Sequence, residues 1–243
     1  MVRVCADRQS LGEAAGEHGA ALLRERLAAK SVVRVIFACA PSQEATLAAL
    51  AAAPGIDWRR VHALHMDEYI GLPDTHPASF RRWLNEHLVA RVRPGRVDYL
   101  NGDAADAKAE CRRYADWVAA SPVDVCFLGI GENGHIAFND PPVADFDDPQ
   151  RVKVVTLDEA CRMQQTAEGH FPTLDDVPRQ ALTLTCPVLL AADYLIASVP
   201  GPRKADAVRQ AIHGPRSTAC PASAIMDHPR ATVYLDAESA SRL

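Results

Sequence analysis

Short apolar runs, many of them β-branched, recur along the chain and are separated by longer stretches of mixed polarity. Runs of this length and composition are typical of β-strands that are covered on both faces. The clearest is Val123–Leu128, which reads Val-Asp-Val-Cys-Phe-Leu. The same pattern predicts further strands at Val32–Ala38, Val61–His65, Val97–Leu100, Val152–Leu157, Ala181–Leu184, Tyr194–Val199 and Ala231–Leu235.

Several of the intervening stretches have the periodicity of amphipathic helices, with apolar residues returning to one face. Helices are predicted at Ser42–Ala53, Ala78–Val92, Ala105–Ala120 and Lys204–Ile212. The alternation of strands and helices predicts a single α/β domain over residues 1–243, with a mostly parallel sheet and helices on both faces. Ligands bind such sheets at the carboxyl ends of the strands, so polar motifs that directly follow a strand are the functional candidates.

Composition narrows the class of protein. The chain is 48% hydrophobic and 23% charged, with a net charge of -5, which argues against a nucleic-acid or membrane-surface binder. No run approaches the roughly 20 apolar residues of a membrane span, and Met1–Asp7 lacks the apolar stretch of a signal peptide, so a cytoplasmic location is expected. Seven scattered cysteines without a Cys-x-x-Cys pair predict neither a disulfide framework nor a metal site.

Three polar segments directly follow predicted strands: Ala38–Glu44, Met66–Gly71 and Gly129–Pro142. The third opens with Gly-x-Gly-x-x-Gly, the spacing of a dinucleotide-binding loop. Such a loop needs a following helix to hold the pyrophosphate, and the prolines at the end of this segment limit any helix to a turn or two. A nicotinamide enzyme is therefore the weaker interpretation, and the glycines are expected to form a tight loop that presents side chains.

Within that loop, His135 can exchange protons near neutral pH. Asp140 and Asn133 lie close to it in sequence, and a carboxylate beside an imidazole fixes its tautomer and stabilises its charged form. This combination favours general acid–base chemistry. The alternative is a histidine that is only hydrogen-bonded within its loop.

The other two segments are weaker signals. Asp67 and Glu68 are neighbours after a strand, so in an extended chain only one of them faces a pocket, while the other caps the next segment or pairs with a cation. Ser42 begins a helix, where it can cap the helix or help to hold a phosphate. Lys204 also begins a helix, where its charge opposes the helix dipole unless an anion binds between them.

Two of these segments resemble signatures of the glucosamine-6-phosphate deaminase (isomerase) family. Val61–Pro73 contains Met-Asp-Glu-Tyr-Ile-Gly-Leu-Pro, and Gly129–Pro142 contains Gly-His-Ile-Ala-Phe-Asn. A third match is Val199–Val208, followed by His-Gly-Pro at 213–215 and Cys220–Ser223. The resemblance runs from about residue 30 to the C-terminus. The related 6-phosphogluconolactonases share the fold but typically lack the Ile-Ala-Phe-Asn continuation.

The resemblance implies a Rossmann-like, doubly wound fold, no metal or organic cofactor, and conversion of an amino-sugar phosphate to a ketose phosphate with release of ammonia. It implies that Asp67 is the base that moves a proton between C2 and C1, that His135 helps to open the sugar ring, and that Lys204 binds the phosphate. The candidate catalytic residues are Asp67, Asn133, His135 and Asp140. The candidate substrate-binding residues are Ser42, Gln43, Glu68, Gly131, Gly134, Arg162 and Lys204.

The chain departs from the family pattern at several positions. Asn133 stands where an acid is usual, Asp140 stands where glutamate is usual, and Arg162 is out of register with the family's phosphate-binding arginine. The paired serines of the allosteric site in regulated members are missing. We therefore expect a divergent branch of amino-sugar catabolism, with a small sugar phosphate as its partner and a homo-oligomer left open. The alternatives are a 6-phosphogluconolactonase-like hydrolase and a non-catalytic sugar-phosphate sensor.

Overall fold

The computed structural model describes residues 1–167, 169 and 171–243. Its centre is a seven-stranded sheet in which every pair of neighbouring strands is parallel. In spatial order the strands are β1 (Val2–Cys5), β10 (Ala231–Asp236), β9 (Tyr194–Val199), β6 (Val125–Leu128), β2 (Val33–Phe37), β3 (Val61–His65) and β5 (Arg96–Asp98). The predicted α/β class with a mostly parallel sheet is confirmed.

The strand order places a topological switch between β2 and β6. From β2 the chain runs outward through β3 to β5, and it then returns to pair β6 with the opposite edge of β2 before continuing outward through β9 to β10. The loops that follow β2 and β6 therefore leave the same end of the sheet on diverging paths. A crevice forms at such a point in parallel sheets, and it is the usual place for a ligand.

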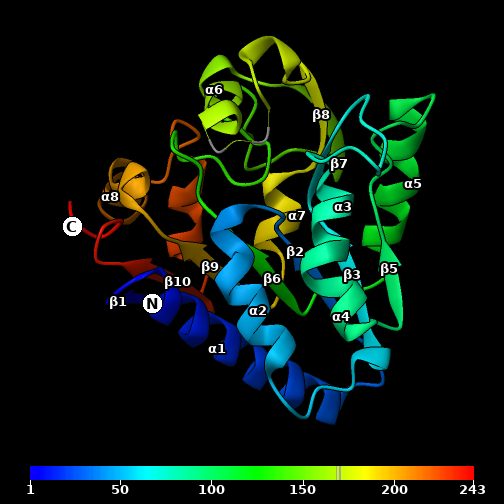
Figure 1. Cartoon of the computed structure of the whole chain (residues 1–243), viewed down its shortest axis with the longest axis vertical. Helices are drawn as coiled ribbons and strands as arrows, with labels where there is room; N and C mark the ends of the chain where they lie inside the picture. The colour runs from blue at the N-terminus through cyan, green and yellow to red at the C-terminus, as the bar shows by residue number, and fades with distance from the viewer. Residues whose placement is uncertain (168, 170) are drawn as a thin grey trace.

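Helices cover both faces of this sheet (Figure 1). One buried cluster joins side chains of α1 (Arg8–Ala29), α2 (Glu44–Ala52) and α3 (Phe80–Leu84) to Val35 and Phe37 of β2. The other joins α5 (Ala107–Ala119), α7 (Cys186–Leu190) and α8 (Ala205–His213) to Ile36, which lies between those two residues. Successive residues of a strand point to opposite faces, so one continuous apolar strand serves both layers. A π-helical segment, Asn85–Val89, joins α3 to the short α4 (Ala90–Val92).

Helix α1 was not predicted, because small residues occupy much of its buried face. A Cβ added at Gly12 would lie 2.3 Å from the Cβ of Ala45, and one added at Gly16 would lie 2.6 Å from the Cβ of Ala49. The absence of these side chains lets α1 and α2 pack closely. The helix begins at a capping box in which Asp7 accepts a hydrogen bond from the Ser10 amide at 2.8 Å, which compensates in part for the low helix propensity of glycine.

A small antiparallel sheet lies over the carboxyl end of the main sheet, with α6 (Glu159–Ala167) beside it (Figure 1). It consists of β4 (Asp67–Tyr69), β8 (Gln180–Leu184) and β7 (Val152–Thr156). The strands predicted near residues 152 and 181 therefore exist but do not join the parallel sheet. The segment 66–71, expected as a loop, contains β4, whose three residues are too few to show an alternating pattern.

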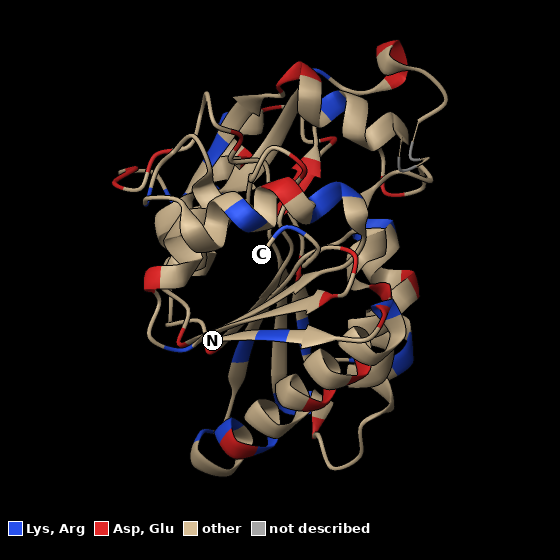
Figure 2. Ribbon diagram, turned by 90° about the vertical axis from the view of Figure 1, so that its left-hand side faces the viewer, with Lys and Arg blue, Asp and Glu red and all other residues tan. Residues whose placement is uncertain are grey.

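Charged residues of both signs are interspersed along the helices and loops (Figure 2), in keeping with the small net charge. Among the described residues, no helix combines the length and the apolar character that are needed to cross a membrane.

Candidate active site

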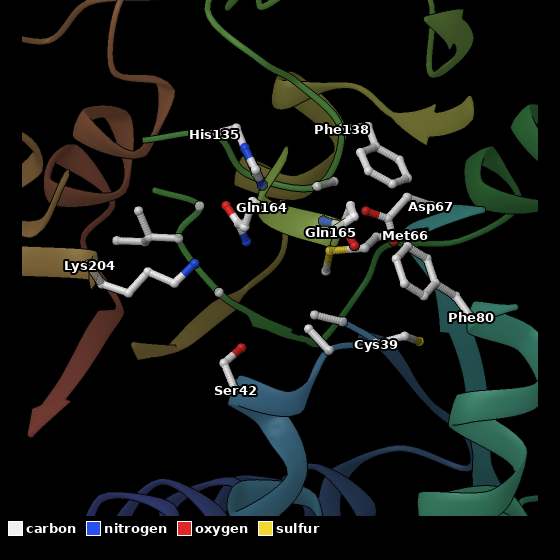
Figure 3. A pocket seen from close by; sticks show the side chains of 16 residues that line it. Cys39, Ser42, Met66, Asp67, Phe80, His135, Phe138, Gln164, Gln165 and Lys204 are labelled. Atoms are coloured by element: carbon white, nitrogen blue, oxygen red, sulfur yellow. The ribbon is translucent and has the colours of Figure 1, made fainter. Parts of the chain in front are cut away.

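A pocket that is partly open to solvent lies at the carboxyl end of the main sheet. The segments that follow β2, β3, β6 and β9 all contribute to it, because the carboxyl ends of parallel strands meet at one edge. Five of the sequence-predicted site residues line it: Ser42, Asp67, Gly131, His135 and Lys204. Figure 3 shows Lys204 and Asp67 on opposite sides of the pocket, with His135 at its rim between them.

Asp67 is the first residue of β4, directly after the turn that leaves β3. Its side chain is buried, and its carboxylate has no hydrogen-bond partner in the described part of the chain. Burial, with a smaller contribution from the neighbouring charge of Glu68, raises the pKa of Asp67 well above its usual range. A carboxylate in this state is a stronger base than an exposed one, which suits it to accept a proton from carbon.

His135 is held by two side chains of its own loop. Its Nδ1 lies 2.8 Å from Asn133 Oδ1 and 2.9 Å from Asp140 Oδ1. Asn133 Nδ2 in turn donates to Asp140 Oδ1 at 3.0 Å, so the three side chains form a closed triangle. Because Nδ1 is engaged on the side of these partners, Nε2 is the ring nitrogen that is left for a ligand in the pocket.

The buried carboxylate of Asp140 is kept ionised by this arrangement. Burial acts to raise the pKa of Asp140, but the hydrogen bond and charge of His135 and the hydrogen bond from Asn133 outweigh it, so the pKa is lowered. Asp140 is 1% exposed and does not line the pocket. It therefore acts on the imidazole and not directly on a ligand, and the same holds for Asn133.

Gly131 and Gly134 lie so close to other atoms of the protein that neither position has room for a side chain. A Cβ at Gly131 would lie 2.2 to 2.3 Å from three atoms of the His135 ring, so a side chain there would displace the imidazole. Gly134 has a φ of +83°, a conformation that favours glycine, and a Cβ there would also collide with Cys220 Sγ at 2.6 Å. Gly131 lines the pocket, whereas Gly134 serves the turn that delivers His135.

Contacts with β8 fix the second half of the loop. Asn139 Nδ2 donates to the carbonyl oxygens of Ile136 at 2.9 Å and Leu184 at 2.8 Å. The amide of Phe138 donates to Thr183 Oγ1 at 3.1 Å. The small sheet therefore supports the loop that carries His135 as well as carrying Asp67 itself.

The opposite end of the pocket has the chemistry of an anion site. Lys204 ends the 3-10 turn Pro202–Lys204 after β9, and its side chain is 7% exposed. Ser42 lies in the turn after β2, where its Oγ accepts a hydrogen bond from Gln43 Nε2 at 3.1 Å, which leaves the hydroxyl hydrogen for another acceptor. Gln43 also donates to the Ser198 carbonyl at 3.1 Å and does not line the pocket, so it positions Ser42.

Glu68 does not contact the pocket, contrary to its prediction as a substrate-binding residue. It is fully buried on the other face of β4, where its Oε1 accepts from the amides of Tyr69 and Phe80 and its Oε2 accepts from Ser79 Oγ and the amide of Arg81, at 2.9 to 3.1 Å. Three of these four donors, all except the Tyr69 amide, lie at the start of α3, where a carboxylate satisfies groups that have no partner within the helix. Of the adjacent acids, only Asp67 faces the pocket, as the alternation of β side chains predicts.

Arg162 is also placed away from the pocket. Its guanidinium donates to the carbonyl oxygens of Leu174 and Val177 and so holds the segment that follows α6. The expected arginine contact to a phosphate is therefore not made by this side chain in the structure.

Helix α6 instead contributes two residues that were not predicted, Gln164 and Gln165. Phe80 and Phe138 line the Asp67 side (Figure 3), and further walls come from Met66 and Cys39. Periodicity could not identify the glutamines, since a polar pair on a short helix is ordinarily exposed. Burial raises the pKa of the Cys39 thiol well above its usual range, which does not favour a nucleophile.

One group of side chains in the described residues has the composition of a metal site. The ligand atoms of His135, Asp140 and Cys161 all lie within 4.8 Å of one another. His135 Nδ1 and Asp140 Oδ1 lie 2.9 Å apart within the triangle, so these two atoms already contact each other. Burial raises the pKa of the Cys161 thiol well above its usual range, which does not favour the thiolate that a metal ion binds.

Comparison with known proteins places the chain in a family. Residues 6–234 match the model of glucosamine-6-phosphate isomerases/6-phosphogluconolactonase. A glucosamine-6-phosphate deaminase of Listeria monocytogenes is 37% identical over 188 residues, which are 77% of this chain and 78% of that protein. A glucosamine-6-phosphate deaminase of an Arthrobacter species is 38% identical over 192 residues, which are 78% of this chain and 72% of that protein.

Solved structures show the same relationship. A structure described as a monomeric glucosamine-6-phosphate deaminase superposes with a TM-score of 0.91 and 32% identity, covering 100% of this chain and 99% of that one. The 6-phosphogluconolactonase of Thermotoga maritima superposes with a TM-score of 0.77 and 20% identity, covering 97% of this chain and 98% of that one. At that lower identity the likeness concerns the fold alone.

Proposed function

Because the chain belongs to the family of glucosamine-6-phosphate isomerases and 6-phosphogluconolactonases, we propose that it is a deaminase, which converts glucosamine 6-phosphate and water to fructose 6-phosphate and ammonia. The reaction would serve the breakdown of amino sugars. The observation that carries the proposal is Asp67, a buried carboxylate without a hydrogen-bond partner among the described residues, in the same pocket as His135 and Lys204.

The reaction needs a base at carbon, and a hydrolysis of a lactone does not. Carbon acids are weak, so a base that acts on C2 must be both close and strongly basic. The raised pKa of Asp67 supplies the second property. Phe80 and Phe138 line that side of the pocket, and apolar surface of this kind favours the neutral form of a nearby carboxyl group and so a raised pKa.

In the proposed sequence of steps, Lys204 and Ser42 bind the phosphate and orient the sugar. His135, protonated at Nε2, gives that proton to the ring oxygen as the C1–O5 bond breaks and takes up the proton of the C1 hydroxyl, which opens the pyranose to its aldehyde. Asp67 then removes the C2 proton while His135 returns its proton to the aldehyde oxygen. Asp67 delivers the C2 proton to C1, so that the aldehyde becomes an alcohol and the amine at C2 becomes an iminium ion. Addition of water to that ion, transfer of one proton back to His135 and loss of ammonia give fructose 6-phosphate.

Behind the pocket, the triangle of Asn133, His135 and Asp140 keeps the imidazole in one orientation. Asp140 stabilises the imidazolium that forms whenever His135 takes up a proton, as a carboxylate does in other histidine dyads. The neutral amide of Asn133 helps to orient the imidazole but carries no charge. Within the triangle, the negative charge beside His135 therefore comes from Asp140 alone.

Ammonia release tests the proposal directly. The protein is incubated with glucosamine 6-phosphate, and ammonia and fructose 6-phosphate are both measured. Asp67→Asn is expected to lower kcat by roughly 10²- to 10⁴-fold, the usual contribution of a general base. The matched control is Asp74→Asn, since Asp74 is exposed in the segment after β4, and it is expected to retain full activity.

The pH profile gives a second measurement. Because the pKa of Asp67 is raised, the acid limb of kcat/KM is expected well above the pKa of about 3.9 of an ordinary aspartate. Release of equal ammonia by wild type and Asp67→Asn would contradict the proposal. Hydrolysis of 6-phosphogluconolactone by both proteins, without ammonia release from the amino sugar, would favour the lactonase alternative.

A further inference from the structure

One face of α6 touches both halves of the candidate active site. Cys161, Gln164 and Gln165 have the spacing i, i+3 and i+4, which places them on the same side of a helix. The Cys161 Sγ lies within 4.8 Å of a carboxylate oxygen of Asp140, and Gln164 Oε1 accepts a hydrogen bond from the amide of Glu132 at 3.0 Å. Gln165 reaches instead toward β4. All three side chains are buried, so this short helix is the part of the pocket wall that bridges the His135 loop and the Asp67 strand.

The orientation of Gln165 is fixed by a single strong contact. Its Oε1 accepts a hydrogen bond from the hydroxyl of Tyr69 at 2.6 Å, and Tyr69 is fully buried. With the oxygen engaged, the amide Nε2 points away from Tyr69 and carries two hydrogens. No residue in the described ranges accepts a hydrogen bond from it. Gln165 is 5% exposed and lines the pocket. Nε2 itself keeps accessible surface, and because Gln165 lines the pocket, an acceptor on a bound ligand can reach this donor.

The position of this donor relative to Asp67 follows from β4. Tyr69 and Asp67 are separated by one residue on that strand, so their side chains share a face. Gln165 is therefore held on the same side as the carboxylate, and Figure 3 shows the two side chains at the same end of the pocket. The charge of Asp67 also contributes to the raised pKa of the Cys161 thiol on α6, which agrees with a short separation between this helix and the base.

We propose that Gln165 is a substrate-binding residue that determines specificity for the sugar, with Nε2 donating a hydrogen bond to a sugar oxygen next to the carbon that Asp67 deprotonates. The inference rests on the proposed deaminase function. The two ends of the pocket then bind different parts of the substrate. Lys204 and Ser42 bind the phosphate, whereas Gln165 donates a hydrogen bond to a sugar oxygen near the reacting carbon. The affinity for an anion that carries no sugar, such as inorganic phosphate, is therefore not expected to depend on Gln165.

Calorimetric titration measures ligand affinity without requiring turnover, so binding at the phosphate end and at the Gln165 end of the pocket can be tested with different ligands. The probes are inorganic phosphate and 2-amino-2-deoxyglucitol 6-phosphate, the reduced open-chain form of the substrate, which cannot isomerise. Gln165→Met keeps the length and helix preference of the side chain but removes the amide. Tyr69→Phe keeps the amide and removes only the contact that orients it. Met163→Leu, at a side chain that is 52% exposed on the same helix, is the control for α6 itself.

Gln165→Met is expected to weaken binding of the sugar alcohol roughly 3- to 10-fold, the value of one neutral hydrogen bond, and to change phosphate binding less than about twofold. Tyr69→Phe is expected to weaken the sugar alcohol by less than Gln165→Met, because the donor is still present. Met163→Leu is expected to leave both affinities unchanged.

Two results would overturn the inference. Equal losses in Gln165→Met and Tyr69→Phe would show that Gln165 only fastens α6 to β4, and parallel losses for phosphate and sugar alcohol would show a general collapse of the pocket. Ammonia release by the wild type is measured in parallel. A wild type that binds the sugar alcohol through Gln165 but releases no ammonia would overturn the proposed function and support the assignment of Gln165.

Discussion

Replacing Glu68 by glutamine is expected to destabilise the protein while leaving the pocket lining chemically intact. Glu68 Oε1 accepts from the amides of Tyr69 and Phe80, and Oε2 accepts from Ser79 Oγ and the amide of Arg81. In Glu68→Gln one oxygen is retained and can keep its two bonds. The new NH₂ group faces two donors and the guanidinium of Arg81, whose Nε lies 3.4 Å from Oε2.

The magnitude follows from those lost contacts. Two hydrogen bonds to a charged acceptor, at about 1.5 kcal/mol each, and donors left unsatisfied in a fully buried place predict a loss of about 2 to 4 kcal/mol in the free energy of unfolding. Ser79→Ala removes one donor and its bond together, so it should cost only about 1 kcal/mol. Glu86→Gln is the control, because Glu86 pairs with Arg82 on the surface, with the side chains 52% and 39% exposed, and such pairs contribute little.

Urea unfolding followed by circular dichroism measures all three variants, with the midpoint and slope giving the free energy. A loss below about 1 kcal/mol for Glu68→Gln, or a loss no larger than that of Glu86→Gln, would refute the argument that Glu68 is held by the start of α3. If Glu68→Gln instead showed a large rise in KM for glucosamine 6-phosphate with unchanged stability, Glu68 would have to be regarded as a substrate-binding residue.

Two further predictions concern stability. Burial lowers the pKa of His65 in the folded protein to about 3, whereas a histidine in the unfolded chain has a pKa near 6.5. As the pH falls below about 6.5, the unfolded chain therefore takes up a proton that the folded protein does not. The free energy of unfolding is expected to fall by about 1.4 kcal/mol per pH unit in this range. The comparison variant is His65→Asn, whose amide oxygen can replace Nδ1 as acceptor for the Leu100 amide. Between pH 7.5 and 5.0, urea unfolding should show that the free energy of unfolding of the wild type falls by about 2 kcal/mol more than that of His65→Asn. Equal losses in the two proteins would contradict the assignment. Gly16→Ala should lower the melting temperature by several degrees, because the added Cβ meets Ala49 Cβ at 2.6 Å and overpacking costs about 1 to 3 kcal/mol, more than the gain in helix propensity. A higher melting temperature in a calorimetric scan would show that α1 and α2 separate without cost.

Local pattern was sufficient for six of the seven strands of the main sheet, all except the edge strand β1, and for the segments that carry Ser42, Asp67, His135 and Lys204. Buried parallel strands are continuous apolar runs, so β2, β3, β6, β9 and β10 could be read directly from composition. The motifs that follow them were predicted to lie together because parallel strands end at one edge, and Asp67, His135, Lys204 and Ser42 do line one pocket. The roles assigned to these four residues remain part of the proposed function.

Tertiary structure alone decided which polar side chains face that pocket. Glu68 and Arg162 belong to the same segments as pocket residues, but their partners are the start of α3 and the carbonyls after α6, which come from other parts of the chain. Gln165 had no signal in sequence, because its burial depends on Tyr69, 96 residues earlier.

The loop Gly129–Pro142 shows the division most clearly. Its glycines and prolines determined from sequence alone that the segment is a tight turn, because backbone conformation is a local property. That Gly131 makes room for the His135 ring, and that Asn133 and Asp140 close a triangle on its Nδ1, depended on how the turn is supported by β8. The physical reason is the range of the forces: torsional preferences act between neighbours, whereas burial and hydrogen bonding require partners that only the folded chain brings together.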